Sequence, residues 1–112
     1  MSKGTTIQYK FVEEYSKYPG VRFIRLGPFS GEDFRENVLR EVFDTEKVDI
    51  AIDATGVVTS FSPSFLDECF GQLAKDYGIT EFKNKVFIFS DDNPNLAEKM
   101  MYYVERAAHD NS

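Results

Sequence analysis

Three serine residues near the middle of the chain are its clearest candidates for chemistry. Ser60, Ser62 and Ser64 stand between an apolar segment at 48–54 and a stretch of helical apolar spacing that begins at Pro63. The first N–H groups of a helix have no carbonyl partner within the helix, and they lie at the positive end of its dipole. These N–H groups bind anions and tolerate a phosphate. The serines are therefore candidates for phosphorylation or for contact with a partner protein.

The same serines also have a purely structural interpretation. Ser62 can cap the helix, because Pro63 would then occupy the first helical position, where its missing N–H costs nothing. Ser64 competes for this role, since Asp67 follows three residues later and completes a capping box. Capping alone would account for both residues, and the sequence leaves the two interpretations open.

Acidic residues form a second candidate site. Asp53 ends a predicted central strand, and Asp91 and Asp92 follow the next one. Ligands of α/β proteins bind at the carboxyl edge of parallel strands, where carboxylates can hold Mg²⁺. The alternative function is therefore a small nucleotide- or Mg²⁺-binding module or enzyme that uses this edge. A structural role in a turn is the stronger interpretation, because Asp-Asp-Asn-Pro is a common sequence for turns.

The rest of the chain offers little catalytic chemistry. Cys69, the only cysteine, lies on an apolar helical stripe and is predicted to be a buried, inert thiol. The single histidine, His109, lies near the end of the chain, and the glycines match neither nucleotide-binding fingerprint. We therefore predict no catalytic residue, no metal and no cofactor.

The elements that position these residues follow the order ββαβαβα. Alternating or continuous apolar residues predict strands, and apolar residues at helical spacing predict helices. The strands are expected at 5–12, 21–26, 48–54 and 85–90, and the helices at 30–44, 63–77 and 94–107. The turn at Tyr18-Pro19-Gly20 suggests that the first two strands pair as a hairpin. The sequence thus predicts an α/β fold in which helices pack on a mixed sheet of about four strands, the later ones parallel.

Composition limits the function further. The 112 residues carry 42% hydrophobic residues and a net charge of −6, which suits one domain spanning residues 1–112 with one core. Binding to nucleic acid or to an anionic membrane needs clustered positive charge, so neither is predicted. The first residues lack the apolar core of a secretory signal, and no apolar run approaches a membrane span. We expect a soluble, cytoplasmic protein.

Three segments resemble one known family. The chain is similar to the small bacterial STAS-like domains, whose function is largely unassigned. The resemblance rests on residues 15–23, 27–36 and 64–71, which include Tyr18-Pro19-Gly20, Gly27-Pro28-Phe29-Ser30-Gly31-Glu32 and Leu66-Asp67-Glu68-Cys69. That family is similar in turn to the STAS domains of anti-sigma factor antagonists. In those signalling modules, a partner kinase with a histidine-kinase-type ATPase fold phosphorylates a serine at a strand-to-helix junction.

The antagonists' motif Asp-Ser-Ser-Gly-Leu-Gly corresponds to the region around Phe61-Ser62-Pro63-Ser64-Phe65-Leu66. Without gaps, Ser62 stands opposite the motif's aspartate, Pro63 opposite the phosphoacceptor serine and Ser64 opposite the second serine. The sequence thus departs from the motif at the phosphoacceptor.

The resemblance implies a non-enzymatic regulatory or protein-interaction domain with a serine-kinase or ATPase partner. The phosphoacceptor or partner-facing candidates are Ser60, Ser62 and Ser64, and the interface candidates are Ser30, Glu32, Arg35, Asp53 and Asp67. A homo-oligomer formed through the exposed edge of the first strand is a further option.

Overall fold

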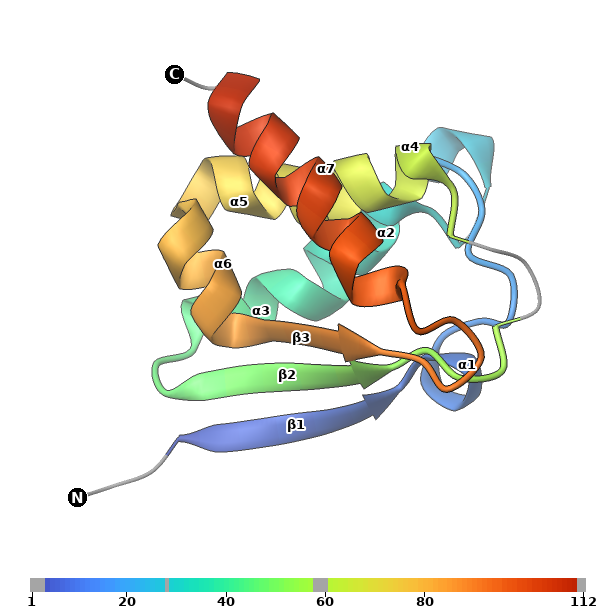
Figure 1. Ribbon diagram of the computed structural model, residues 1–112, viewed down its shortest axis with the longest axis horizontal. Coiled ribbons are helices and arrows are strands. Elements are labelled where there is room, and N and C mark those ends of the chain that lie inside the picture. Colours follow the sequence, from blue (N-terminus) through green and yellow to red (C-terminus); the bar gives the residue numbers. More distant parts are fainter. Residues whose placement is uncertain (1–3, 28, 58–60, 111–112) are drawn as a thin grey trace.

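A three-stranded parallel sheet forms the base of the molecule. The computed structural model describes residues 4–27, 29–57 and 61–110. The strands are β1 (Thr5–Lys10), β2 (Val48–Asp53) and β3 (Val86–Phe89), in the order β1-β2-β3. Both pairings are parallel, as expected for strands joined by helical crossovers. Figure 1 shows the longer helices gathered on one side of this sheet.

Two of the helices above the sheet are each built from three consecutive segments, and we call them the two long helices. The first crossover helix comprises α2 (Gly31–Phe34), the π-helical turn η2 (Arg35–Leu39) and α3 (Arg40–Asp44). The serine helix comprises α4 (Pro63–Leu66), the π-helical turn η3 (Asp67–Gly71) and α5 (Gln72–Tyr77). Both helices confirm the predicted ranges. The remaining helical segments are α1 (Phe11–Glu14), the 3₁₀ turn η1 (Ile24–Leu26), α6 (Ile79–Lys85) and α7 (Leu96–Asp110).

A serine caps each of the two long helices. Ser30 Oγ accepts the N–H of Asp33 at 3.0 Å, and Ser62 Oγ accepts the N–H of Phe65 at 3.0 Å. Ser30 and Asp33 have the spacing of a capping box, but only the bond to Ser30 Oγ forms among the described residues. The Asp33 carboxylate instead accepts hydrogen bonds from the Tyr15 hydroxyl and from the Asn37 amide.

The predicted strand at 21–26 is wrong, and with it the four-stranded sheet and the opening ββ hairpin. The carbonyls of Val21 and Arg22 accept the N–H groups of Gly31 and Glu32, each at 2.9 Å. These donors belong to the first turn of the first crossover helix, where N–H groups lack intrahelical partners. The carbonyls of this segment therefore accept hydrogen bonds from the start of a helix and not from a strand. β1 pairs with β2 instead.

Two short helices also differ from expectation. α1 ends the first strand at Lys10, two residues before the predicted end. α6 occupies residues for which the sequence predicts no helix, and Gly78, with φ 95°, turns the chain between α5 and α6. α7 begins at Leu96, close to the predicted start at Pro94.

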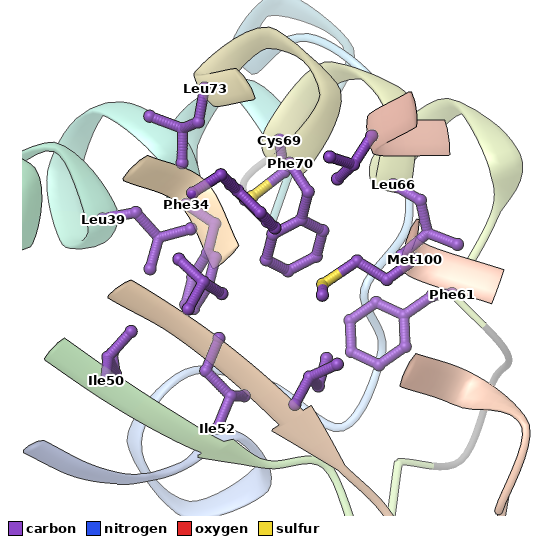
Figure 2. Packing of buried hydrophobic residues seen from close by; sticks show 14 of the residues in the cluster. Phe34, Leu39, Ile50, Ile52, Phe61, Leu66, Cys69, Phe70, Leu73 and Met100 are labelled. Carbon is purple, nitrogen blue, oxygen red and sulfur yellow. The ribbon is translucent and has the colours of Figure 1, made fainter. Parts of the chain in front are cut away.

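Phenylalanine side chains pack with leucine, isoleucine and valine in the core between the sheet and the helices (Figure 2). Phe34 and Phe65 come from the two long helices and have no exposed surface. Cys69 is fully buried, as predicted, and burial raises the pKa of its thiol well above the ordinary value. At Gly31 the two helices almost touch, since an added Cβ would lie 2.8 Å from the Phe65 carbonyl oxygen. Close helix packing of this kind requires glycine.

Lys85 closes the opposite end of the first crossover helix. Its buried ammonium donates hydrogen bonds to the carbonyls of Val42, Thr45 and Val48, at 3.0, 2.9 and 2.8 Å. A cation at this position complements the negative end of the helix dipole. Lys85 thus ties the end of α3 and the start of β2 to the start of β3.

The helices in the described part of the chain are all too short or too polar to cross a membrane.

Candidate functional site

The hydroxyl of Ser62 both accepts and donates a hydrogen bond. Besides capping the serine helix, its Oγ donates a hydrogen bond to the carbonyl of Gly20 at 2.9 Å. Pro63 occupies the first helical position, as predicted. Ser62 therefore joins the start of the serine helix to the loop that precedes Val21.

Replacing Ser62 by alanine should destabilise the fold. Loss of the cap and of the bond to Gly20 should lower the free energy of unfolding by about 2 kcal/mol in urea denaturation. Ser64→Ala, two residues away in the same helix, is the matched control, and its effect should stay within about 0.5 kcal/mol. Equal losses for the two variants would contradict the assigned role of Ser62.

Ser64 lies at a small polar pocket. This serine pocket has a volume of about 250 Å³. Its lining residues come from the segment before η1, the start of the serine helix and α7: Arg22, Pro63, Ser64, Asp67, Tyr103 and Arg106. Two guanidinium groups thus share the pocket with a partly exposed serine and one carboxylate.

The two arginines of the serine pocket differ in their hydrogen-bond and ion-pair partners. Arg22 Nη1 donates to Asp67 Oδ2 at 2.8 Å and to Glu68 Oε1 at 3.3 Å. The hydrogen bond to Asp67 is the main reason why the pKa of Arg22 is raised. Arg106 is exposed, and it makes no hydrogen bond or ion pair within residues 4–27, 29–57 and 61–110. Arg106 is therefore available to bind an anion.

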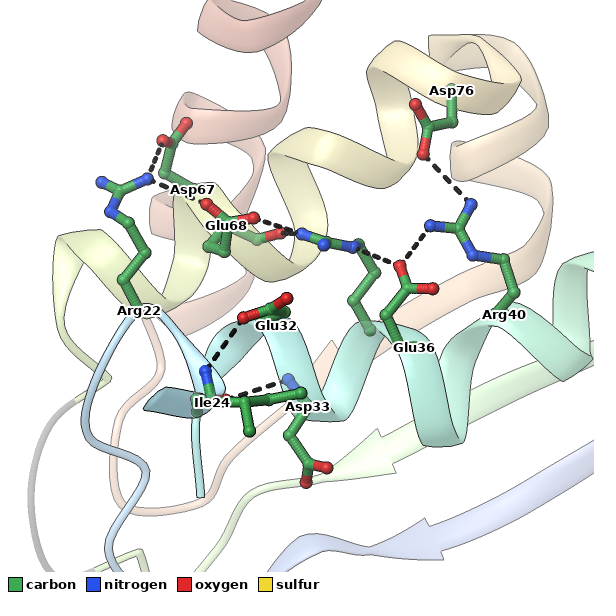
Figure 3. A network of polar contacts seen from close by, with 11 residues as sticks. Arg22, Ile24, Glu32, Asp33, Glu36, Arg40, Asp67, Glu68 and Asp76 are labelled. Carbon is green, nitrogen blue, oxygen red and sulfur yellow. Dashed lines mark hydrogen bonds and ion pairs between the residues drawn. The ribbon is translucent and has the colours of Figure 1, made fainter. Parts of the chain in front are cut away.

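A chain of charged residues leads from the serine pocket across both long helices (Figure 3). Arg35 pairs with Glu68 at 2.5 Å and with Glu36 at 2.8 Å, and it also donates to the main-chain carbonyl of Glu68. Arg40 continues the chain by pairing with Glu36 and, at 3.1 Å, with Asp76. The hydrogen bond from Arg40 is the largest cause of the lowered pKa of Glu36. The network fixes the two helices relative to each other.

The structure places the predicted site residues in different environments. Ser30 has no exposed surface, Glu32 accepts the N–H of Ile24 at 2.9 Å, and the side chain of Arg35 is only 12% exposed. These three residues hold the first crossover helix in place. Asp67 is the interface candidate that lies at the serine pocket, beside Ser64. Ser60 lies outside the described residues.

The acidic edge of the sheet is occupied by turn hydrogen bonds. Asp53 Oδ1 accepts the N–H of Thr55 at 2.9 Å, and this bonding to Thr55 lowers the pKa of Asp53. Asp92 Oδ2 accepts the N–H of Gly56 at 2.6 Å, and the N–H of Asp91 donates to Thr55 Oγ1 at 3.0 Å. No group of three or more metal-ligand side chains forms among the residues that the structure describes. The magnesium alternative gains no support.

Sequence reasoning missed the contribution of α7 to the serine pocket. Tyr103 and Arg106 lie about 40 residues after Ser64, and no motif in the sequence links them to it. Their approach depends on how α7 crosses the serine helix. Gly71 permits that crossing, because an added Cβ would lie 3.1 Å from Ala107 Cβ and 3.3 Å from the Tyr103 carbonyl oxygen.

Comparison with known proteins identifies the family. Searches of curated proteins and of solved structures find no match. A family model described as a STAS-like domain of unknown function matches residues 30–96, which is more than half of the chain. The matched region begins at the Ser30 cap and includes the serine helix, β2 and β3. The chain therefore belongs to the family of STAS-like domains of unknown function.

Proposed function

We propose that the chain is a non-enzymatic regulatory domain that binds a partner protein at the serine pocket and is switched by phosphorylation of Ser64. One observation carries this proposal: a partly exposed serine shares its pocket with Arg22 and with Arg106, which has no ion-pair partner in the described residues. Arginine clusters are the usual means by which proteins bind phosphorylated residues. In the first turn of the serine helix, the N–H groups of Phe65 and Leu66 already bond to Ser62, so the helix start adds only the N–H of Ser64 itself.

Ser64 is a better phosphoacceptor than Ser62. The hydroxyl of Ser62 already accepts the N–H of Phe65 and donates to Gly20, so a phosphate there would break a cap. Ser64 makes no side-chain hydrogen bond with the described residues and lines the pocket directly. It is also the residue that stands opposite a serine of the antagonists' motif.

The proposed reaction is transfer of a phosphoryl group from ATP by a separate kinase. The Ser64 oxygen forms a bond to the γ-phosphorus, the bond between that phosphorus and ADP breaks, and the hydroxyl proton is released. The product adds about −1.5 to −2 charge units at neutral pH. The pocket contains two arginines and one aspartate, so its charge changes from positive to negative. A partner that presents an acidic surface would bind only the unmodified form.

The pocket can be tested by placing phosphoserine at position 64 through genetic encoding. The second pKa of the phosphate, followed by ³¹P NMR, should lie below the ordinary value of about 6, because Arg106 and Arg22 favour the dianion. Arg106→Gln should move this pKa back toward 6. Arg25→Gln, at an exposed arginine that does not line the pocket, is the matched control.

The modification itself needs a second measurement. Incubation with ATP and a serine kinase of the histidine-kinase-type ATPase class should place phosphate on Ser64, as mapped by mass spectrometry. Ser64→Ala should abolish labelling and Ser62→Ala should not. Labelling of Ser62 alone would refute the switch. A phosphate pKa that is the same with and without Arg106→Gln would also refute it.

The proposed partner follows the same argument. It is a cytoplasmic protein with an acidic recognition surface, of which a serine kinase is the first example to test. The net charge of −6 gives no support for nucleic acid or membranes as partners.

A further inference from the structure

A second surface lies at the opposite edge of the sheet from β3. β1 is an edge strand, and its core-facing side chains are less covered than those of its neighbours. Ile7 is 38% exposed, whereas Ile50, its partner on β2, is 1% exposed. The helical layer therefore covers β2 and leaves part of β1 open.

An apolar hollow occupies this uncovered region. Its volume is about 400 Å³, and we call it the β1 hollow. Its walls come from β1, β2 and the first crossover helix, with Glu14 of α1 beside them: Ile7, Tyr9, Glu14, Val38, Glu41, Val42, Thr45, Val48 and Ile50. Most of these side chains are apolar, so a ligand in the hollow would bury apolar surface.

The charged groups at the hollow are all acidic. Glu14 and Glu41 line it, and both are exposed. Glu41 has no ion-pair or side-chain hydrogen-bond partner among the residues described, and the Glu14 carboxylate accepts the N–H of Lys10 at 2.7 Å. Burial, then Glu14 and Asp33, raise the pKa of Tyr9 to about 12. The hollow is thus suited to an occupant that combines apolar and cationic side chains.

The free edge of β1 defines the shape of that occupant. The N–H of Thr5 donates toward β2, to the carbonyl of Lys47, whereas the N–H of Lys10 points outward to Glu14. Backbone groups of a strand point alternately to its two sides, so the N–H groups of Thr6 and Gln8 face the open side as well. An extended segment can add to such an edge through main-chain hydrogen bonds.

We infer that the β1 edge and the β1 hollow form a docking site for an extended, basic and apolar segment of a partner protein. The segment adds a fourth strand beside β1, inserts alternate apolar side chains into the hollow and places a lysine or arginine next to Glu41 or Glu14. A second copy of this chain fits less well, because it would bring its own glutamates and a net charge of −6 to an acidic edge. The site is separate from the serine pocket and does not depend on phosphorylation of Ser64.

An array of synthetic hexapeptides tests this inference. Each peptide alternates Val, Ile, Phe or Tyr with Lys, Glu or Ser, and binding of the full chain is measured on every member. Lysine peptides should be enriched over glutamate peptides of the same apolar pattern. A lysine peptide in solution should shift the amide NMR signals of Thr6, Gln8 and Glu41.

Charge reversal supplies the matched variants. Glu41→Lys should weaken binding of the best lysine peptide by about tenfold, since an attractive pair becomes a repulsive one. Glu105→Lys, at an exposed residue of α7, should change binding by less than about twofold. Ser64→Ala should leave peptide binding unchanged, which separates this site from the proposed switch.

Three results would overturn the inference. The first is an absence of any preference for lysine over glutamate peptides. The second is a set of NMR shifts that maps to β3 or the serine pocket. The third is sedimentation evidence for a dimer that Glu41→Lys disrupts or strengthens, because a second copy would then occupy the edge.

Discussion

Replacing Lys85 by methionine is expected to lower the free energy of unfolding by about 3 kcal/mol, since each hydrogen bond to a charged donor contributes roughly 1.5–3 kcal/mol and part of that loss is recovered by hydration. Methionine keeps an unbranched, apolar side chain, with a sulfur in place of one methylene, and removes the ammonium. The carbonyls of Val42, Thr45 and Val48 would then lose their shared donor at the end of α3. Urea denaturation followed by circular dichroism measures the loss.

Lys83→Met provides the control for Lys85. Lys83 lies in the same helix but is exposed, so its replacement should change stability by no more than about 0.5 kcal/mol. If the two variants differed by less than 1 kcal/mol, the three carbonyl contacts of Lys85 would not be the source of stability that we assign to them.

Replacing Gly31 by alanine should lower the free energy of unfolding by about 2 kcal/mol, as is usual for a methyl group added to a closely packed site. The new Cβ would lie 2.8 Å from the Phe65 carbonyl oxygen and 3.2 Å from the Phe65 Cα, and backbone atoms cannot move aside as a flexible side chain does. The two long helices must therefore separate. Alanine would otherwise stabilise a helical position relative to glycine by roughly 0.5–1 kcal/mol, so the sign of the effect is diagnostic.

Gly20→Ala is the matched control for Gly31. A Cβ at position 20 would meet only the Tyr18 carbonyl oxygen, at 3.8 Å, which is ordinary contact. Thermal unfolding should show a lower midpoint for Gly31→Ala and a nearly unchanged one for Gly20→Ala. A stable Gly31→Ala variant with an intact near-ultraviolet spectrum would show that the helix crossing is looser than described.

Local chemistry made the two long helices predictable from the sequence. Ser30 and Ser62 with Pro63 define helix starts through short-range hydrogen bonds, and the apolar spacing from Phe65 to Leu73 identifies the buried face. These features depend on neighbours a few residues away. The family resemblance, which the match at 30–96 confirms, rests partly on these helices, since two of its three segments, 27–36 and 64–71, include helical residues.

The wrong strand at 21–26 has a different cause. Its residues are of types common in strands, but the carbonyls of Val21 and Arg22 accept hydrogen bonds from Gly31 and Glu32. The side chain of Arg22 also donates hydrogen bonds to Asp67 and Glu68. These partners lie far along the chain or in another element, so single-sequence patterns do not reveal them. The same is true of the serine pocket, which Arg106 and Ser64 line together because α7 crosses the serine helix at Gly71.

The parallel sheet also has a consequence for how the chain folds. Thr5 pairs with Val48, and Ile50 pairs with Val86, so each pairing closes a loop of roughly 40 residues before any strand contact forms. Non-local pairing of this kind slows folding. On the ribosome, β1 would leave the exit tunnel long before β2 and wait without a partner strand. The helix caps at Ser30 and Ser62 can form in that interval, so we expect helices to precede the sheet during synthesis.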